Sequence, residues 1–244
     1  MARTSIITGA GSGIGLATAK ALHAAGDAIV GIGRSADKLV GLAEALGTEE
    51  RLATLALDIT DADAPHAIVD FALERFGCID TLVNNAGLGS PTPLHETDDA
   101  TLDLFLDVML RAPFRLCREA IAHMGEGGCV VNVTSTFAMI GGKRGGPYSA
   151  AKGGLRSLTE HMAVEYGPRG IRSNCVAPGV TMTDMVRHRF EDETFKRVNV
   201  ETTPYPRLAE AEDLANVIAF LCSPGGEMIN GQSIVVDGGW TRTK

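Results

Sequence analysis

The sequence predicts an α/β fold of Rossmann type: a doubly wound, mostly parallel sheet of about seven strands with helices on both faces. Two observations predict it. Short runs rich in β-branched residues alternate with helix-length segments along the whole chain, and a glycine-rich segment joins the first such run to the first helix. No linker, internal repeat or low-complexity tract divides the 244 residues. We therefore expect residues 1–244 to form one domain.

Each element follows from local pattern. Runs such as Ser5-Ile6-Ile7-Thr8 read as buried strands, and apolar residues at helical spacing, such as Ala17, Ala21 and Leu22, mark one face of a helix. Asp61 is expected to cap the third helix. The predicted strands are 5–8, 28–33, 52–57, 81–83, 129–134, 171–176 and 233–236, and the predicted helices are 13–25, 36–46, 61–76, 98–124, 147–166 and 209–222.

Residues 180–208 show no clear period and are longer than most connections. Long loops within compact domains are commonly lids or binding loops, so we expect a substrate lid here.

Composition excludes several classes of function. The net charge of −8 argues against a nucleic-acid partner, and no apolar run approaches the roughly 20 residues of a membrane span. The N-terminus leads directly into a strand and leaves no room for a signal peptide. The five cysteines and six histidines are scattered, which predicts no metal site and reduced thiols in a cytoplasmic protein.

The segment 8–15 lies between the first strand and the first helix and contains Gly9, Gly13 and Gly15. Glycines let the main chain approach a phosphate, and the helix N-terminus directs free N–H groups at the same place. The spacing differs from G-x-G-x-x-G, and a tight turn without a ligand is the alternative. The strand–loop–helix context favours dinucleotide binding.

Several short motifs follow in order. They are Asn84-Asn85-Ala86-Gly87, Ser135, Tyr148-Ser149-Ala150-Ala151-Lys152, Pro178-Gly179, Gly231-Gln232 and Asp237-Gly238-Gly239. With the glycine loop, this series resembles the short-chain dehydrogenase/reductase family over essentially the whole chain. The resemblance implies a nicotinamide-dependent oxidoreductase that interconverts a small-molecule carbonyl, of ketone or 3-oxoacyl type, and a secondary alcohol.

Tyr148 and Lys152 are four residues apart and therefore share one face of a helix. A nearby ammonium favours the phenolate, so we expect Lys152 to lower the pKa of Tyr148 and make it an acid/base catalyst. A surface tyrosine beside a solvated lysine is the alternative. The resemblance implies that Ser135 binds the substrate oxygen and that Lys152 also binds the nicotinamide ribose.

The resemblance also implies a cofactor site. Gly33 stands where relatives that select NAD have an acidic residue, and Arg34 follows it. An arginine can bind the 2′-phosphate with several donors, which favours NADP, with NAD as the alternative. The implied cofactor residues are Gly9, Ser12, Gly13, Ile14, Gly15, Arg34, Asp58, Ile59, Asn85, Ala86, Gly87, Tyr148, Lys152, Pro178, Gly179, Thr181 and Thr183.

One position departs from the family. Met109 stands where an asparagine usually completes the catalytic group and seats a water that relays protons to the lysine. Methionine offers no comparable polar side chain. This departure leaves an alternative function open, a dinucleotide-binding sensor or scaffold with weak or no turnover.

The substrate is expected to lie under the predicted lid. An apolar lining is expected from Phe137, Met139, Ile140, Met182 and Met185; the lid cations Arg187, His188, Arg189, Lys196 and Arg197 either meet an anionic substrate or are simply solvated. The resemblance implies a homo-oligomer, most often a tetramer, with apolar contact surface from Trp240 and from the helices 98–124 and 147–166.

Overall fold

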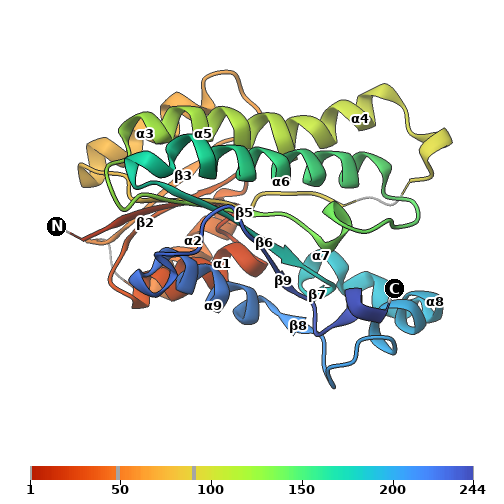
Figure 1. Cartoon of the computed structure of the whole chain (residues 1–244). Helices are drawn as coiled ribbons and strands as arrows, with labels where there is room; N and C mark the ends of the chain where they lie inside the picture. Colours follow the sequence, from red (N-terminus) through yellow and green to blue (C-terminus); the bar gives the residue numbers. More distant parts are fainter. Residues whose placement is uncertain (1, 48–49, 90–91, 244) are drawn as a thin grey trace.

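The computed structural model describes residues 2–47, 50–89 and 92–243, except for the side chains of Asp184, Met185 and His188. A seven-stranded sheet forms its centre, in the order β3-β2-β1-β4-β5-β6-β9 and with parallel pairing throughout (Figure 1). The predicted fold class is confirmed. The strands are β1 Thr4–Thr8, β2 Ala28–Gly33, β3 Leu52–Ala56, β4 Thr81–Asn84, β5 Cys129–Val133, β6 Arg172–Pro178 and β9 Ser233–Val236.

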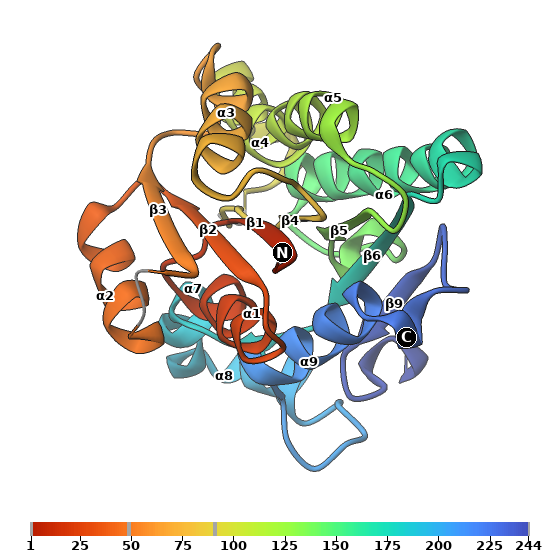
Figure 2. The same ribbon diagram turned by 90° about the vertical axis from the view of Figure 1, so that its left-hand side faces the viewer.

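Helices cover both faces of the sheet. The helices α3, α4, α5 and α6 lie on one face, and α1, α2 and α9 lie on the other (Figures 1 and 2). In the described part of the chain, no helix is long and apolar enough to cross a membrane. The helices are α1 Gly13–Ala24, α2 Ala36–Leu46, α3 Ala64–Phe76, α4 Asp99–Leu106, α5 Ala112–His123, α6 Gly146–Tyr166, α7 Asp184–Arg187, α8 Glu193–Phe195 and α9 Ala211–Cys222.

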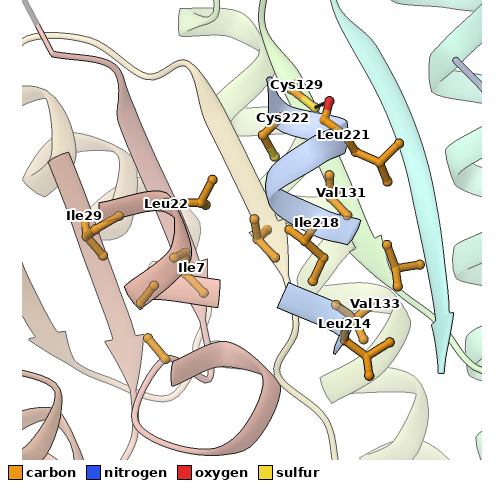
Figure 3. Close-up of a cluster of buried hydrophobic side chains, with 14 of the residues drawn as sticks. Ile7, Leu22, Ile29, Cys129, Val131, Val133, Leu214, Ile218, Leu221 and Cys222 are labelled. Atoms are coloured by element: carbon orange, nitrogen blue, oxygen red, sulfur yellow. Dashed lines mark hydrogen bonds between the residues drawn. The ribbon is translucent and has the colours of Figure 1, made fainter. Parts of the chain in front are cut away.

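The sheet is buried on both sides, which explains why its strands read as continuous apolar runs rather than alternating ones. On one side, Leu214 and Ile218 of α9 pack toward Val131 and Val133 of β5 (Figure 3). A second apolar cluster lies on the opposite side, between the sheet and the helices α3 and α5. This double burial fixes the register of the strands, and with it the positions of the loops at their carboxyl ends.

Two predicted helix starts are wrong. Helix α3 begins at Ala64, with Asp63 rather than Asp61 at the N-cap position; Asp61 lies in a preceding turn, where its carbonyl accepts the N–H of Ala64. Helix α9 begins at Ala211, because residues 209–210 pair as a short strand.

The long helix predicted over 98–124 is interrupted. A π-helical turn, Asp107–Arg111, separates α4 from α5. Pro113 has no N–H and cannot make the hydrogen bond that an unbroken α-helix would send to the Met109 carbonyl. The wider turn contains Met109, the position at which the expected asparagine is absent.

The segment 180–208 consists of short elements. It opens with β7 Thr181–Met182, which pairs with β8 Ala209–Glu210 and so closes the base of the segment. Between them lie α7, a 3-10 turn His188–Glu191, α8 and a second π-helical turn, Lys196–Val200.

Candidate active site

The predicted site residues gather at the carboxyl ends of the parallel strands, where ligands bind in sheets of this kind. The glycine loop follows β1, and the sequence 84–87 ends β4. Ser135 follows β5 and Pro178 ends β6, whereas Tyr148 and Lys152 lie on α6. Predicted site residues that are far apart in sequence thus lie at one edge of the sheet.

The glycine loop is shaped for close approach of main chain. Gly9 and Gly13 have φ of +68° and +51°, values that side chains resist. A Cβ on Gly15 would lie 2.2 Å from the Gly9 carbonyl oxygen. Ser12 is the N-cap of α1 but makes no side-chain capping hydrogen bond. Its hydroxyl and the first N–H groups of α1 are therefore suited to an anion.

Asn85 fastens the end of β4 to this loop. Its Nδ2 donates to the carbonyls of Thr8 at 2.9 Å and Gly9 at 3.3 Å. The N–H groups of Asn85 and Ala86 both donate to Thr8 Oγ1 at 3.0 Å. These bonds hold the predicted cofactor segment 85–87 rigidly beside the glycine loop.

The start of the segment 180–208 lies opposite the same loop. A Cβ on Gly13 would lie 3.3 Å from Thr183 Cγ2. Thr181 is buried, and its hydroxyl donates to the Gly179 carbonyl at 3.3 Å. The Asp237-Gly238-Gly239 motif packs behind, since a Cβ on Gly179 would lie 2.6 Å from Asp237 Cβ. The predicted phosphate-binding residues are thus brought together.

The ends of β2 and β3 carry Arg34 and Asp58, which form an exposed ion pair at 3.8 Å. Asp58 also accepts hydrogen bonds from Thr60 N and Oγ1, and these bonds are the main reason that its pKa is lowered. An exposed ion pair contributes little stability, so Arg34 can turn to a phosphate at small cost. The predicted cofactor residue Ile59 packs partly buried against the core.

Two of the predicted catalytic side chains, Tyr148 and Ser135, lie close together, and Lys152 lies one turn further along α6. Ser135 lies close enough to Tyr148 to lower the pKa of its phenol, but burial outweighs this effect and raises that pKa. The expectation that Lys152 lowers this pKa is wrong. Lys152 Nζ instead donates to the Val133 carbonyl at 2.7 Å, and burial lowers its own pKa to about 8. Tyr148 is therefore held as a neutral proton donor.

Met109 lies in the π-helical turn and is fully buried in an apolar cluster that includes Phe105, Ala151 and Tyr148. A Cβ on Gly87 would lie 3.6 Å from Met109 Sδ and 3.8 Å from Lys152 Nζ. The thioether and the Lys152 ammonium therefore both border Gly87, and the expected asparagine would have offered polar atoms in place of the thioether.

A buried chain of hydrogen bonds anchors α6, and sequence analysis missed it. Asn84 Nδ2 donates to Asn132 Oδ1, and Asn132 Nδ2 donates to Thr159 Oγ1, both at 2.8 Å. Thr159 Oγ1 donates to the Leu155 carbonyl at 2.9 Å, and Cys175 Sγ donates to Thr159 Oγ1 at 3.1 Å. The available signal was polar residues inside apolar strands. This network ties the helix that carries Tyr148 to β4, β5 and β6.

On the substrate side, Met139 and Met182 are exposed, as expected for a lining, whereas the side chains of Met185 and His188 lie outside the described residues. Two of the predicted cations are already engaged. Arg189 stacks over Phe195 at 4.4 Å, and Lys196 pairs with Glu193 at 2.6 Å. The described side chains therefore give the anionic-substrate alternative little support.

Trp240, expected to contribute surface for subunit contact, is buried within the chain instead. Its indole lies against the segment 180–208, which covers it.

These groups fit a dinucleotide. The positive φ values at Gly9 and Gly13, the uncommitted Ser12 cap and the rigid segment 85–87 form a cradle for its phosphates. Beside that cradle stand a proton donor and a buried ammonium. In the described part of the chain, no cluster of three His, Cys, Asp or Glu side chains could hold a metal ion. Fold and site together define a Rossmann-type oxidoreductase that depends on a dinucleotide.

Comparison with known proteins agrees. A family model described as enoyl-(acyl carrier protein) reductase matches residues 9–241. An A-factor type gamma-butyrolactone 1′-reductase (1S-forming) from Streptomyces virginiae is 37% identical over 98% of this chain and 95% of its own length. A cis-4-hydroxycyclohexanecarboxylate dehydrogenase from Sinomonas cyclohexanicum is 38% identical, over 98% and 96%.

Among solved structures, a short chain dehydrogenase from Burkholderia cenocepacia in complex with NADP superposes with a TM-score of 0.90. It is 33% identical, with 98% of each chain covered. The chain belongs to the short-chain dehydrogenase/reductase family. It is a nicotinamide-dependent oxidoreductase that interconverts alcohol and carbonyl groups.

Proposed function

We propose that this enzyme reduces a ketone with NADPH, with Tyr148 as the proton donor. The observation that carries the proposal is the approach of Tyr148 to Ser135 near the buried Lys152, with the pKa of Tyr148 raised by burial. A tyrosine that stays protonated at neutral pH is suited to donate a proton, which is the need of the reductive direction.

In this mechanism the substrate oxygen accepts hydrogen bonds from the hydroxyls of Ser135 and Tyr148. Bound NADPH supplies a hydride, which carries two electrons to the carbonyl carbon and leaves the cofactor oxidised. Tyr148 gives its proton to the same substrate's oxygen, so that the product is a secondary alcohol. As an ammonium, Lys152 would then help return a proton to Tyr148, which restores the phenol.

The cofactor would be held along its length by groups already in place. Ser12, Gly13 and the N-terminus of α1 would bind its phosphates, and the segment 85–87 would line its middle. The exposed Arg34 at the end of β2 supports NADP over NAD, as does the solved relative that contains NADP. We propose that the segment 180–208 covers the bound substrate as a lid.

We also propose that the enzyme is a cytoplasmic homo-oligomer, and a tetramer as the family resemblance implies. Exposed apolar side chains on α4, α5 and α6 support subunit contact, with Leu104, Phe114 and Val164 exposed by 49%, 48% and 80%. The five cysteines are free thiols, which suits a reducing compartment.

The test is a panel of ketones with both nicotinamide cofactors, followed at the nicotinamide absorbance. The panel begins with acyl lactones and oxocyclohexane carboxylates, the substrate types for which the two relatives are named, and includes 3-oxoacyl thioesters. Oxidation of NADPH by at least one ketone is expected; a panel without turnover would contradict the proposed function.

Tyr148→Phe isolates the proton donor, because it deletes the hydroxyl and keeps the ring in its apolar cluster. Turnover should fall by about 10²-fold or more, while the Kd for NADPH stays close to that of the unmodified protein. Tyr166→Phe, at the far end of α6, is the matched control and should keep full turnover. Undiminished turnover in Tyr148→Phe would assign proton transfer to another group.

A further inference from the structure

The outer half of the segment 180–208 is docked onto the C-terminal turn. Gly238 and Gly239 have φ of +62° and +87°. A Cβ on Gly238 would lie 2.8 Å from Thr203 Cγ2, and one on Gly239 would lie 3.3 Å from Pro204 Cγ. The N–H of Tyr205 donates to the Gly238 carbonyl at 3.0 Å. The two glycines thus let residues 203–205 approach the backbone of the turn closely.

Asp237 fixes the shape of this turn. Its Oδ1 accepts the N–H of Gly239, and its Oδ2 accepts the N–H of Thr241, both at 2.8 Å. The Trp240 N–H also donates to the Asp237 carbonyl at 3.2 Å. The backbone of Trp240 is therefore held from both sides, and its side chain is only 6% exposed.

Two separate parts of the site meet on the indole of Trp240. Its Nε1 donates to the Val198 carbonyl at 3.0 Å, within the π-helical turn Lys196–Val200. The Phe137 ring contacts it edge to face, with centroids 6.0 Å apart and planes at 84°. The N–H of Phe137 in turn donates to Ser135 Oγ at 3.1 Å. One side chain therefore connects the segment 180–208 to the turn that carries the catalytic serine.

We propose that Trp240 is a positioning residue for the substrate site: it couples the placement of the segment 180–208 over the substrate to the placement of the Ser135 hydroxyl. This inference rests on the proposed function of Ser135. The indole contacts Phe137 and the outer half of the segment 180–208, whereas the glycine loop follows β1 and Arg34 follows β2. Loss of the indole should therefore impair use of the carbonyl substrate much more than binding of the cofactor.

The first experiment separates substrate from cofactor. Trp240→Phe deletes the donor to Val198 and keeps an aromatic ring, and Phe137→Leu deletes the edge-to-face contact. Each should raise KM for the ketone about fivefold, the scale of one lost hydrogen bond or ring pair, with the Kd for NADPH unchanged. The double variant should raise KM by less than the product of the two single increases, because both substitutions act through one contact.

The matched control is Phe220→Leu, which changes an exposed aromatic side chain on α9. It should leave both constants unchanged. An unchanged KM in Trp240→Phe would overturn the proposal. Parallel increases in KM and in the Kd for NADPH, together with a lower Tm, would also overturn it, because they would indicate a merely structural role.

The second experiment needs no turnover and so stands even if the proposed function fails. Limited trypsin digestion reports on the lysine and arginine sites within residues 187–197. Trp240→Phe should speed cleavage there, with cleavage elsewhere and the Tm unchanged, and Phe137→Leu should expose the single tryptophan of the chain to acrylamide. Unchanged cleavage in Trp240→Phe would show that the indole does not hold the segment.

Discussion

At the scale of single residues, burial shifts the pKa values of two ionisable side chains of the site in opposite directions. The pKa of Tyr148 is raised and that of Lys152 is lowered to about 8. Each shift favours the uncharged form of its group, because charge is costly away from water. Near neutral pH the site therefore combines a protonated phenol with an ammonium that is close to losing its proton.

A pH dependence follows for the reductive direction. The Lys152 ammonium is present below about pH 8 and is lost above it, whereas Tyr148 stays protonated through this range. kcat/KM for ketone reduction should therefore be highest near pH 7 and fall as the pH rises through about 8. Lys152→Arg, which keeps its charge, should flatten that fall even if its activity is lower. A flat profile in the unmodified protein would contradict this prediction.

Cofactor choice is also decided at the residue scale. Arg34→Ala should weaken NADPH binding about tenfold with little effect on NADH, because a charge-assisted contact to the 2′-phosphate is lost. Gly33→Asp should shift preference further toward NADH; its Cβ would meet Leu39 only at an ordinary 3.5 Å. Lys20→Ala, an exposed charge on α1, is the control for net charge. Equal Kd values for the two cofactors in the unmodified protein would contradict NADP selectivity.

At the scale of elements, the break between α4 and α5 places Met109 in a π-helical turn, from which its side chain borders Gly87, as Lys152 does. The π-helical turn is present although the asparagine of the family is not, since Pro113 disfavours an unbroken α-helix whichever residue stands at 109. The π-helical turn is thus present, whereas a thioether stands in place of the polar side chain.

Met109→Asn tests what that replacement costs. If a polar side chain assists proton delivery to Lys152, kcat should rise by up to about 10²-fold with KM little changed, the signature of an interaction made in the transition state. Met109→Leu should leave kcat unaltered. A lower Tm is expected in the asparagine variant, because it places an amide in an apolar cluster. An unchanged kcat would mean that proton delivery does not use this side chain, and a silent parent with an active variant would favour the sensor alternative.

At the scale of the whole molecule, the exposed apolar side chains on the α4, α5 and α6 face predict self-association. Light scattering at micromolar concentration should give a mass that is a multiple of the monomer's 25.6 kDa, with four copies for the proposed tetramer. Val164→Asp should lower that mass, since it places a charge in the expected contact. Val40→Asp, an exposed position on α2, should not. A monomer mass for the unmodified protein would contradict the oligomer.

Much of the architecture was predictable because its signals are local. The alternation of β-branched runs with helical segments specified a parallel α/β sheet, and the glycines at 9, 13 and 15 predicted a tight loop between β1 and α1. The spacing of Tyr148 and Lys152 placed both on one helix face, since helical geometry converts a separation of four residues into adjacency. These features need no knowledge of which element lies next to which.

Tertiary structure decided the rest, because it depends on partners that are distant in sequence. Spacing alone could not show that Lys152 donates to Val133 on β5, or that burial raises the pKa of Tyr148. Nor could it show that Trp240 meets Val198 and Phe137 inside the chain. The sequence specifies which hydrogen bonds each side chain can make and how much apolar surface it can bury. Only the packing of separate elements determines its hydrogen-bond partner and its exposure to water.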